Sequence, residues 1–212
     1  LDFKQRNADG AQPIQIDLQK LTSLKNFSDF DKHTVDLVKS ALAFPFNLSV
    51  DVDMKNTTKN ALYFSSPETF LPDAGNYKDS SADQLLTIFE KQSVQLLKLA
   101  GFNENESKKY AANAIKFDKL LAKYKKSQEE LNDIAGIYNP YSISDFKAAF
   151  TNMNIDQLLN GLLPNSPEKV IITEPKFLQH INELLSPDKF EELKSWLVVT
   201  FINHYATYLS QE

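Results

Sequence analysis

The sequence feature that most constrains the fold of this chain is one switch in the spacing of its apolar residues. In residues 46–54, FNLSVDVDM, apolar and polar side chains alternate, and this alternation is typical of a half-buried strand. The next six residues, KNTTKN, predict a turn, and ALYFSS after them predicts a returning strand. We therefore expect a small β-hairpin at about residues 46–65, with Asp51 and Asp53 pointing outward from its first strand.

Most of the remaining sequence has the spacing of helices. Only 5 of the 212 residues are glycine while 15 are phenylalanine, and such a chain favours packed helices. One further stretch, EKVIIT (168–173), predicts a short strand. The expected fold class is therefore mainly α, a multi-helix bundle-like domain with the small hairpin and this one extra strand. Residues 1–12 are expected to be a flexible N-terminal segment, and residues 13–212 to form the helical domain.

Two predicted helices, 82–100 and 104–125, have the clearest patterns. Gly101 follows the first of them, at the position where a glycine commonly ends a helix. The residues expected to face the core are Leu85, Ile88, Phe89, Leu96 and Leu99 in the first helix and Tyr110, Ala111, Ala114, Phe117, Leu121 and Tyr124 in the second. Lys109, Lys116, Lys119 and Lys123 lie off that second stripe and predict a solvated face. Five other helices are expected. The first covers 13–24, and the second begins at Ser28 or Asp29, includes Ala41 and ends before Pro45. The third runs from Ser142 or Ser144 through Phe150, the fourth lies in NIDQLLNGLLP, and the fifth covers 174–185.

The last predicted helix begins at Ser186 and is apolar on nearly every side. Residues 196–202, WLVVTFI, belong to it, and its main stripe extends to Tyr208. A helix with apolar residues all round needs partners on several faces. It is therefore either the central helix of this domain or a helix that packs on material outside this chain.

Charge and composition exclude several classes of protein. The formal net charge is −5 and the only arginine is Arg6, whereas nucleic-acid-binding proteins concentrate basic residues and use arginine widely. The chain has no cysteine, which excludes disulfides and cysteine-bound zinc and fits a reducing compartment. No apolar run approaches the roughly 18–20 residues that cross a bilayer. We therefore expect neither nucleic acid nor membrane as a partner. The start LDFKQRNADG lacks a signal-peptide pattern and predicts a segment of a longer chain or a processed end.

Asp51 and Asp53 superficially resemble the first ligands of a calcium loop. Such a loop also needs glycine at its sixth position and a bidentate glutamate at its twelfth. Asn56 and Leu62 occupy those positions, and Lys55 would place a positive charge inside the loop. The outward face of a strand therefore explains the two aspartates better than a cation does.

Other catalytic and metal-binding patterns are also missing. The three histidines, His33, His180 and His204, are not spaced one helical turn apart as in a zinc peptidase motif. His180 and Glu183 share a helix face, so His180 is expected to make a helix-surface contact. His204 lies on an apolar stripe and is expected to be half-buried. Phosphate-binding glycine loops and nucleophile elbows are absent, and the pairs Glu129–Glu130 and Glu191–Glu192 point to different helix faces. We therefore assign no catalytic, metal-binding or cofactor-binding residue in this chain.

Four blocks of the sequence nevertheless resemble one family. The stretch SVDVDMKNTTKNALYFSSPETFLPD (49–73), followed by Tyr77, resembles the non-catalytic helical part of neprilysin-type zinc metallopeptidases, in particular the bacterial endopeptidase O branch. YNPYSISDF, VIITEPKFLQHINELL and LKSWLVVTFIN resemble later blocks of the same family. The four blocks occur in the family's order, so the resemblance covers the chain from about residue 10 to its end.

The resemblance implies that residues 13–212 are the helical, non-catalytic lobe of a longer zinc endopeptidase that hydrolyses oligopeptides. The lobe would form one wall of a substrate chamber. The catalytic lobe of the same polypeptide would be its partner, and the zinc-binding motifs would lie beyond Glu212, so this chain alone is predicted to be inactive. The sequence Asn60-Ala61-Leu62-Tyr63 matches the family's substrate-binding strand only in part, because it has an extra residue and different surroundings. We therefore assign it no substrate-binding role.

The resemblance also implies a location: animal members of the family carry disulfides and a membrane anchor, and this sequence has neither. We therefore expect a bacterial, cytoplasmic enzyme rather than an extracellular or cell-surface one. The alternative function is a self-contained helical protein-binding module with no enzymatic parent. The apolar stretch 196–202 should distinguish the two functions. A fragment of a larger enzyme should leave part of that helix or of its neighbours exposed, whereas a self-contained module should cover every apolar face.

Overall fold

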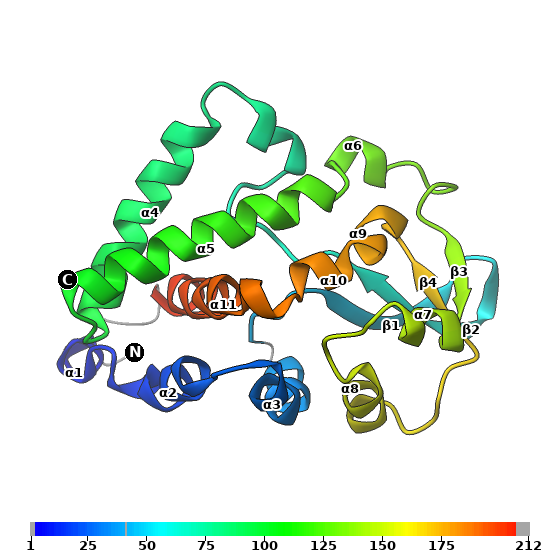
Figure 1. The fold of residues 1–212 in the computed structure, drawn as a ribbon, viewed down its shortest axis with the longest axis horizontal. Coiled ribbons are helices and arrows are strands. Elements are labelled where there is room, and N and C mark those ends of the chain that lie inside the picture. Colours follow the sequence, from blue (N-terminus) through cyan, green and yellow to red (C-terminus); the bar gives the residue numbers. More distant parts are fainter. Residues whose placement is uncertain (1–2, 41, 207–212) are drawn as a thin grey trace.

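The structure is a computed structural model that describes residues 3–40 and 42–206. It confirms a mainly α fold with a small β part (Figure 1). The α-helices are α1 (Phe3–Asp9), α2 (Gln15–Ser23), α3 (Phe27–Lys39), α4 (Ala82–Leu99), α5 (Glu104–Tyr124), α6 (Gln128–Leu131), α7 (Ile143–Ala148), α8 (Ile155–Leu162), α9 (Pro175–Gln179), α10 (Ile181–Leu184) and α11 (Phe190–Tyr205). The strands are β1 (Asn47–Asp53), β2 (Asn56–Ser65), β3 (Asn139–Ser142) and β4 (Lys169–Ile172). Three short 3₁₀ turns, η1 (Gln12–Ile14), η2 (Ala74–Lys78) and η3 (Pro187–Lys189), complete the order.

Helix α11 is the central helix of the domain, which confirms the first of the two expected alternatives. It packs against α2, α4 and α5, and Figure 1 shows it beneath the long helix α5 and above α2. Burial on all sides explains why its sequence is apolar nearly all round. The buried residues within 196–202 are Trp196, Leu197, Val198, Val199, Phe201 and Ile202.

The sheet has the strand order β1-β2-β4-β3. β1 and β2 are antiparallel, β2 and β4 are parallel with Leu62 opposite Val170, and β3 is antiparallel to β4. The strand predicted at 168–173 is confirmed as β4, whereas β3 was not predicted. Its sequence NPYS contains Pro140, and a proline is tolerated because β3 lies at an edge of the sheet.

The hairpin is confirmed, but its turn and its alternation differ from the prediction. The turn is only Met54 and Lys55, and residues 56–60, predicted as turn, belong to β2. Val50 and Val52 are 58% and 45% exposed, whereas Asp53, expected to point outward, is only 2% exposed. The register shifts between Val52 and Asp53, which turns Asp53 to the covered side.

The predicted buried face of α4 is wrong in part. Leu85, Ile88 and Leu99 are exposed, and the face that packs on the domain includes Leu86 and Leu97. The reason is that α4 is an outer helix whose neighbours α5 and α11 cover one side only. As expected for a fragment, a neighbour of α11 therefore leaves apolar residues exposed, although residues 196–202 themselves are covered.

Other helix predictions need smaller corrections. Residues 3–9 form α1, within the segment expected to be loose. Asn26 caps α3, because its side chain accepts the backbone N–H of Asp29 at 3.0 Å, two residues before the predicted cap. The helix predicted at 174–185 is two short helices that meet at His180. Ala41 and Tyr208, both placed in predicted helices, lie outside the described residues.

The long helix α5 is as predicted. Its stripe from Ala111 to Tyr124 is buried, and Lys109, Lys116, Lys119 and Lys123 are exposed. A capping box at Asn103 and Glu106 begins the helix. Gly101, between α4 and α5, has a φ of +100°, a backbone conformation that favours glycine.

Candidate functional site

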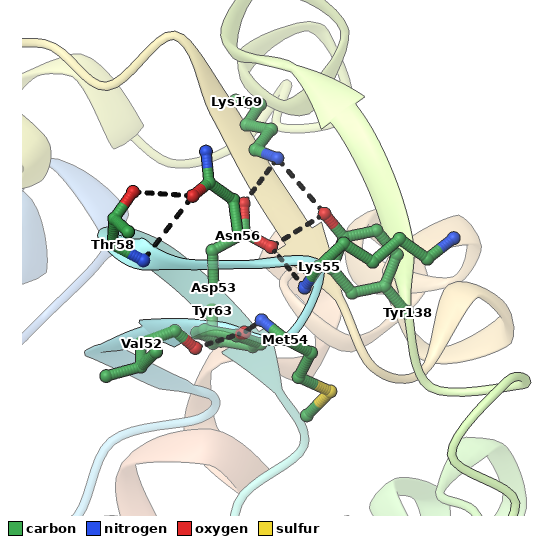
Figure 2. Close-up of polar contacts among 9 residues, drawn as sticks. All are labelled: Val52, Asp53, Met54, Lys55, Asn56, Thr58, Tyr63, Tyr138 and Lys169. Atoms are coloured by element: carbon green, nitrogen blue, oxygen red, sulfur yellow. Dashed lines mark hydrogen bonds and ion pairs between the residues drawn. The ribbon is translucent and has the colours of Figure 1, made fainter.

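The tip of the β1–β2 hairpin holds the most connected polar cluster near the sheet (Figure 2). The buried carboxylate of Asp53 forms an ion pair with Lys169 on β4, at 2.6 Å from Oδ2 to Nζ. Its Oδ1 accepts hydrogen bonds from the Tyr138 hydroxyl and from the backbone N–H of Lys55, both at 2.9 Å. The Lys169 amino group also donates to the Tyr138 hydroxyl at 3.1 Å. We call Asp53, Tyr138 and Lys169 the hairpin clamp, since they join the hairpin tip to β4 and the segment before β3.

A second tyrosine closes the turn from the other side. The Tyr63 hydroxyl donates to the carbonyl oxygen of Val52 at 2.8 Å and accepts the N–H of Met54 at 3.2 Å. The Lys55 ammonium lies 4.5 Å from the centre of the Tyr138 ring, a cation–π distance. Both ends of the turn are therefore fixed by side chains from outside the turn.

The electrostatics of the clamp follow from these contacts. The hydrogen bond from Lys169, together with those from Lys55 N–H and Tyr138, lowers the pKa of Asp53 to about 2. The same contact with Asp53 raises the pKa of Lys169. Both partners therefore stay charged at neutral pH. Both carboxylate oxygens of Asp53 already accept hydrogen bonds from these donors, so this residue acts as a structural anchor. These contacts agree with the interpretation of Asp53 as a strand residue rather than a calcium ligand.

The clamp should be visible in hydrogen exchange. We expect Asp53→Asn to accelerate amide exchange over residues 52–58 by about tenfold, because the tip loses its ion pair while the side chain keeps its size. In the native chain the stabilisation is complete above the unfolded pKa of about 3.9 and is lost as the pH falls through about 2. The control is Asp51→Asn, at an exposed position of the same strand. Equal exchange in both variants would contradict the role of the clamp.

A buried carboxylate in the helical part organises the irregular segment after β2. Asp118 on α5 is fully buried. Its Oδ1 accepts the Phe70 N–H at 3.0 Å and the Trp196 indole N–H at 3.1 Å, and its Oδ2 accepts the Tyr77 hydroxyl. Burial raises the pKa of Asp118 to about 6. Burial and the nearby Asp118 charge raise the pKa of Tyr77.

Glu174, just before α9, is the third buried acid with a bridging role. Its Oε2 accepts the backbone N–H of Ser66 and its Oε1 that of Lys126, both at 2.7 Å. Through Glu174 the end of β2 is tied to the segment after α5. Asp118 and Glu174 therefore fix the two ends of the segment 66–77, and both serve as hydrogen-bond acceptors for the fold.

The histidines do not gather into a site. The His180 ring stacks on Tyr124 at 3.9 Å between ring centres, which confirms a helix-surface contact. His204 was expected to be half-buried and is exposed, because it lies on the outer side of α11 near the end of that helix. Within residues 3–40 and 42–206, no group of three or more histidines and acidic residues is arranged to hold a metal ion. The described residues therefore do not fit a zinc site.

One groove of about 390 Å³ lies between the end of α11 and the start of β1. We call it the aromatic groove, and its aromatic lining residues are Phe44, Phe46, Trp196, Phe201 and Tyr205. The polar residues on it include Asn47, Glu68, Thr200 and His204. Such a lining, mostly apolar with a few polar groups, is typical of sites that take an apolar side chain or small molecule.

Sequence reasoning assigned no site residue and missed the three buried acids. One signal was available for Asp118: it directly follows Phe117 and lies three residues before Leu121, so it interrupts a buried apolar stripe. Asp53 had no such signal, since its partner Tyr138 is 85 positions away in the chain. The aromatic groove combines residues from three separate segments, within 38–48, 67–68 and 196–205, and could not be predicted either.

Comparisons with known proteins identify the family. The model of the N-terminal domain of peptidase family M13 matches residues 1–212. The chain is 46% identical to a neutral endopeptidase of Lactobacillus helveticus and 28% identical to one of Lactococcus lactis subsp. cremoris. Each match covers all of this chain but only 33% and 34% of those proteins.

Solved structures agree with this match. The crystal structure of PepO from Lactobacillus rhamnosus superposes with a TM-score of 0.89 at 29% identity, over 99% of this chain and 34% of that chain. The zinc metalloprotease Zmp1 of Mycobacterium tuberculosis has a TM-score of 0.88 at 18% identity, over 99% of this chain and 32% of that chain, which shows a shared fold. This chain therefore belongs to peptidase family M13, the neprilysin-type metallopeptidases, and spans about a third of the length of the relatives it matches.

Proposed function

We propose that this chain is the helical, non-catalytic lobe of a neprilysin-like zinc endopeptidase that hydrolyses peptide bonds in oligopeptides. The observation that carries the proposal is the match of family M13 over residues 1–212, combined with a length of only a third of the relatives. The names of those relatives, neutral endopeptidases, and of Zmp1, a zinc metalloprotease, support the reaction class and the metal.

The lobe is proposed to form one wall of the substrate chamber rather than to take part in bond cleavage. Its buried acids support this division of roles, because Asp53, Asp118 and Glu174 all serve as hydrogen-bond acceptors within the fold. Since the described residues do not fit a zinc site, the rest of the polypeptide is proposed to hold the metal. The partners of the lobe are then the catalytic lobe of the same chain and the peptide substrate.

The proposed activity can be tested on the full-length polypeptide. We expect it to cleave an unstructured peptide of about ten residues, to lose that activity with a zinc chelator, and to regain it with added zinc. The same ten residues placed within a rigid folded protein should be cleaved at least about a hundredfold more slowly, because the wall excludes folded domains. Equal cleavage of both substrates would contradict the wall, and activity that survives complete metal removal would contradict the reaction class.

The proposed location is the bacterial cytoplasm. No helix within the described residues is long and apolar enough to cross a membrane. Cell fractionation of the producing bacterium, with detection of the full-length protein, tests this location directly. Recovery in the culture medium or on the cell surface would contradict it.

A further inference from the structure

The first strand of the hairpin is an open edge of the sheet. β1 lies at the end of the order β1-β2-β4-β3, so within residues 3–40 and 42–206 β2 is its only partner strand. Alternate residues of such a strand direct their N–H and C=O groups away from the sheet, where an extended chain can bind. Natural edge strands are commonly blocked by charged side chains, proline or a β-bulge. β1, NLSVDVD, contains no lysine or proline, and its two aspartates and its register shift lie in its distal half, at residues 51–53.

Leu48, Val50 and Val52 of β1 extend the apolar face of the sheet toward the hairpin tip. Val50 pairs with Leu62 and therefore points to the same face, and Leu62 is buried in the main core. Val50 and Val52 are nevertheless 58% and 45% exposed. Figure 1 shows the hairpin at the opposite end of the molecule from α4. An extended segment added beside β1 would therefore find apolar contacts on one face and the outward backbone groups of Leu48 and Val50. The N–H and C=O of Val52 are already bonded to the Asp51 carboxylate and the Tyr63 hydroxyl.

The aromatic groove is continuous with this edge. Phe46, Asn47 and Leu48, at the start of β1, form part of its lining. Thr200 lies on the groove as well, and its buried hydroxyl has no hydrogen-bond partner within the described structure. Peptides that add a strand to a sheet gain affinity from backbone hydrogen bonds and specificity from side-chain pockets. The open edge and the groove supply these two elements next to each other.

The charges at the two ends of β1 give the ligand a direction. Glu68 lies on the groove, and the described residues that line the groove include no lysine or arginine. At the other end of the strand, the exposed charges are Lys55, Lys59 and the carboxylate of Asp51, while Asp53 is paired with Lys169, so positive charge is in excess. A peptide with its amino terminus at the groove and an acidic carboxyl end at the hairpin tip would complement both ends. It would run parallel to β1, whose seven residues span about 23 Å at roughly 3.3 Å per residue.

The edge is also held rigidly, which favours binding. The hairpin clamp and the Tyr63 hydroxyl fix the two-residue turn, so little conformational freedom is lost when a partner strand is added. We propose that the outer edge of β1 and the aromatic groove form a binding site for an extended peptide of about seven residues, with a large apolar residue near its free amino terminus in the groove. The site rests on the proposed function, because peptides are the substrate class of that function.

The binding test uses the full-length polypeptide with its metal removed by a chelator, so that the probe is not cleaved. The probe is the heptapeptide Phe-Ser-Val-Lys-Val-Ser-Glu, in which Phe and both valines share one face of the extended chain. A fluorophore is attached to the side chain of its central lysine, and anisotropy gives its Kd. We expect Val50→Lys/Val52→Lys to raise the Kd at least about tenfold, because lysine on an edge strand opposes strand addition. The control is Ile88→Lys on α4, a residue that is 56% exposed, which should leave the Kd unchanged. A Kd within twofold of the native value in the valine variant would overturn the proposal.

Two further measurements test the orientation and the occupant. Glu68→Gln should weaken the free-amine probe about threefold and leave its N-acetylated form unchanged, and an equal effect on both would overturn the direction. Hydrogen exchange should show that the outward-facing amides of Leu48 and Val50 become protected when the probe binds, whereas the alternate amides of β1 are already protected by their bonds to β2. Protection of the Leu48 and Val50 amides without the probe would mean that the remaining polypeptide covers the edge, which overturns the site. If the metal-loaded enzyme cleaves peptides normally while the valine variant binds like the native protein, this inference fails and the proposed function stands.

Discussion

Replacing Trp196 with alanine is expected to lower the free energy of unfolding of this chain by about 4 kcal/mol, because a buried indole in the central helix leaves a large cavity. Trp196 is fully covered by its neighbours. Its ring centre lies 5.9 Å from that of Phe117 and 6.5 Å from that of Phe70. Its indole N–H donates to Asp118 at 3.1 Å, so the alanine variant loses both packing and one hydrogen bond to a buried carboxylate.

Urea unfolding followed by far-UV circular dichroism measures this loss. Trp196→Phe separates the two contributions, since it retains most of the ring packing and removes the indole donor, and a smaller loss of about 1.5 kcal/mol is expected. An exposed apolar residue, Leu85→Ala on α4, serves as the control and should change stability by less than about 0.5 kcal/mol. A loss below about 1 kcal/mol for the alanine variant of Trp196 would contradict the central position of α11.

Replacing Asp118 with alanine is expected to cost about 3 kcal/mol at neutral pH, because three buried donors lose their acceptor. These donors are the Phe70 N–H, the Trp196 indole N–H and the Tyr77 hydroxyl. The segment 66–77 should also exchange its amides faster, since it loses its attachment to α5. Asp83→Ala, at an exposed position on α4, is the control, and unchanged exchange in segment 66–77 would contradict the anchoring role.

The pH dependence of Asp118 provides an independent check. Its folded pKa of about 6 lies above the unfolded value of about 3.9, so its contribution to stability is complete below about pH 4 and declines as the pH rises through 6. Two pKa units correspond to about 3 kcal/mol. The stability difference between the native chain and Asp118→Asn should therefore shrink between pH 4.5 and pH 7.5. A difference that grows with pH would show that the pKa of Asp118 is not raised.

Local patterns predicted those parts of the fold that depend on near neighbours in the sequence. The stripe of α5 and the location of the hairpin were correct, because spacing alone decides which of their residues share a face. The exposed face of α4 was predicted incorrectly because Leu85 and Ile88 have good helical spacing, but only their tertiary neighbours decide whether that face is covered. For the same reason the sequence could not decide whether α11 is covered within this domain or by material outside this chain. In the structure α2, α4 and α5 pack against it.

The candidate site depends on contacts between distant segments, so the sequence could indicate little of it. Asp53 was expected to point outward because the alternation was extended through the end of the strand. A register shift and the contacts of Lys169 and Tyr138 with its carboxylate reverse that orientation. The family could be predicted because the resemblance uses order and spacing of sequence blocks rather than contacts, and the match over residues 1–212 confirms it.

The central claim is that this chain is one lobe of a zinc endopeptidase and carries no catalytic centre of its own. The direct measurement is metal analysis of the purified 212-residue chain after incubation with zinc and gel filtration, together with a fluorogenic peptide assay of the same sample. We predict zinc well below one equivalent per chain and no peptide cleavage above background. One tightly bound zinc per chain, or cleavage that a chelator abolishes, would contradict the account.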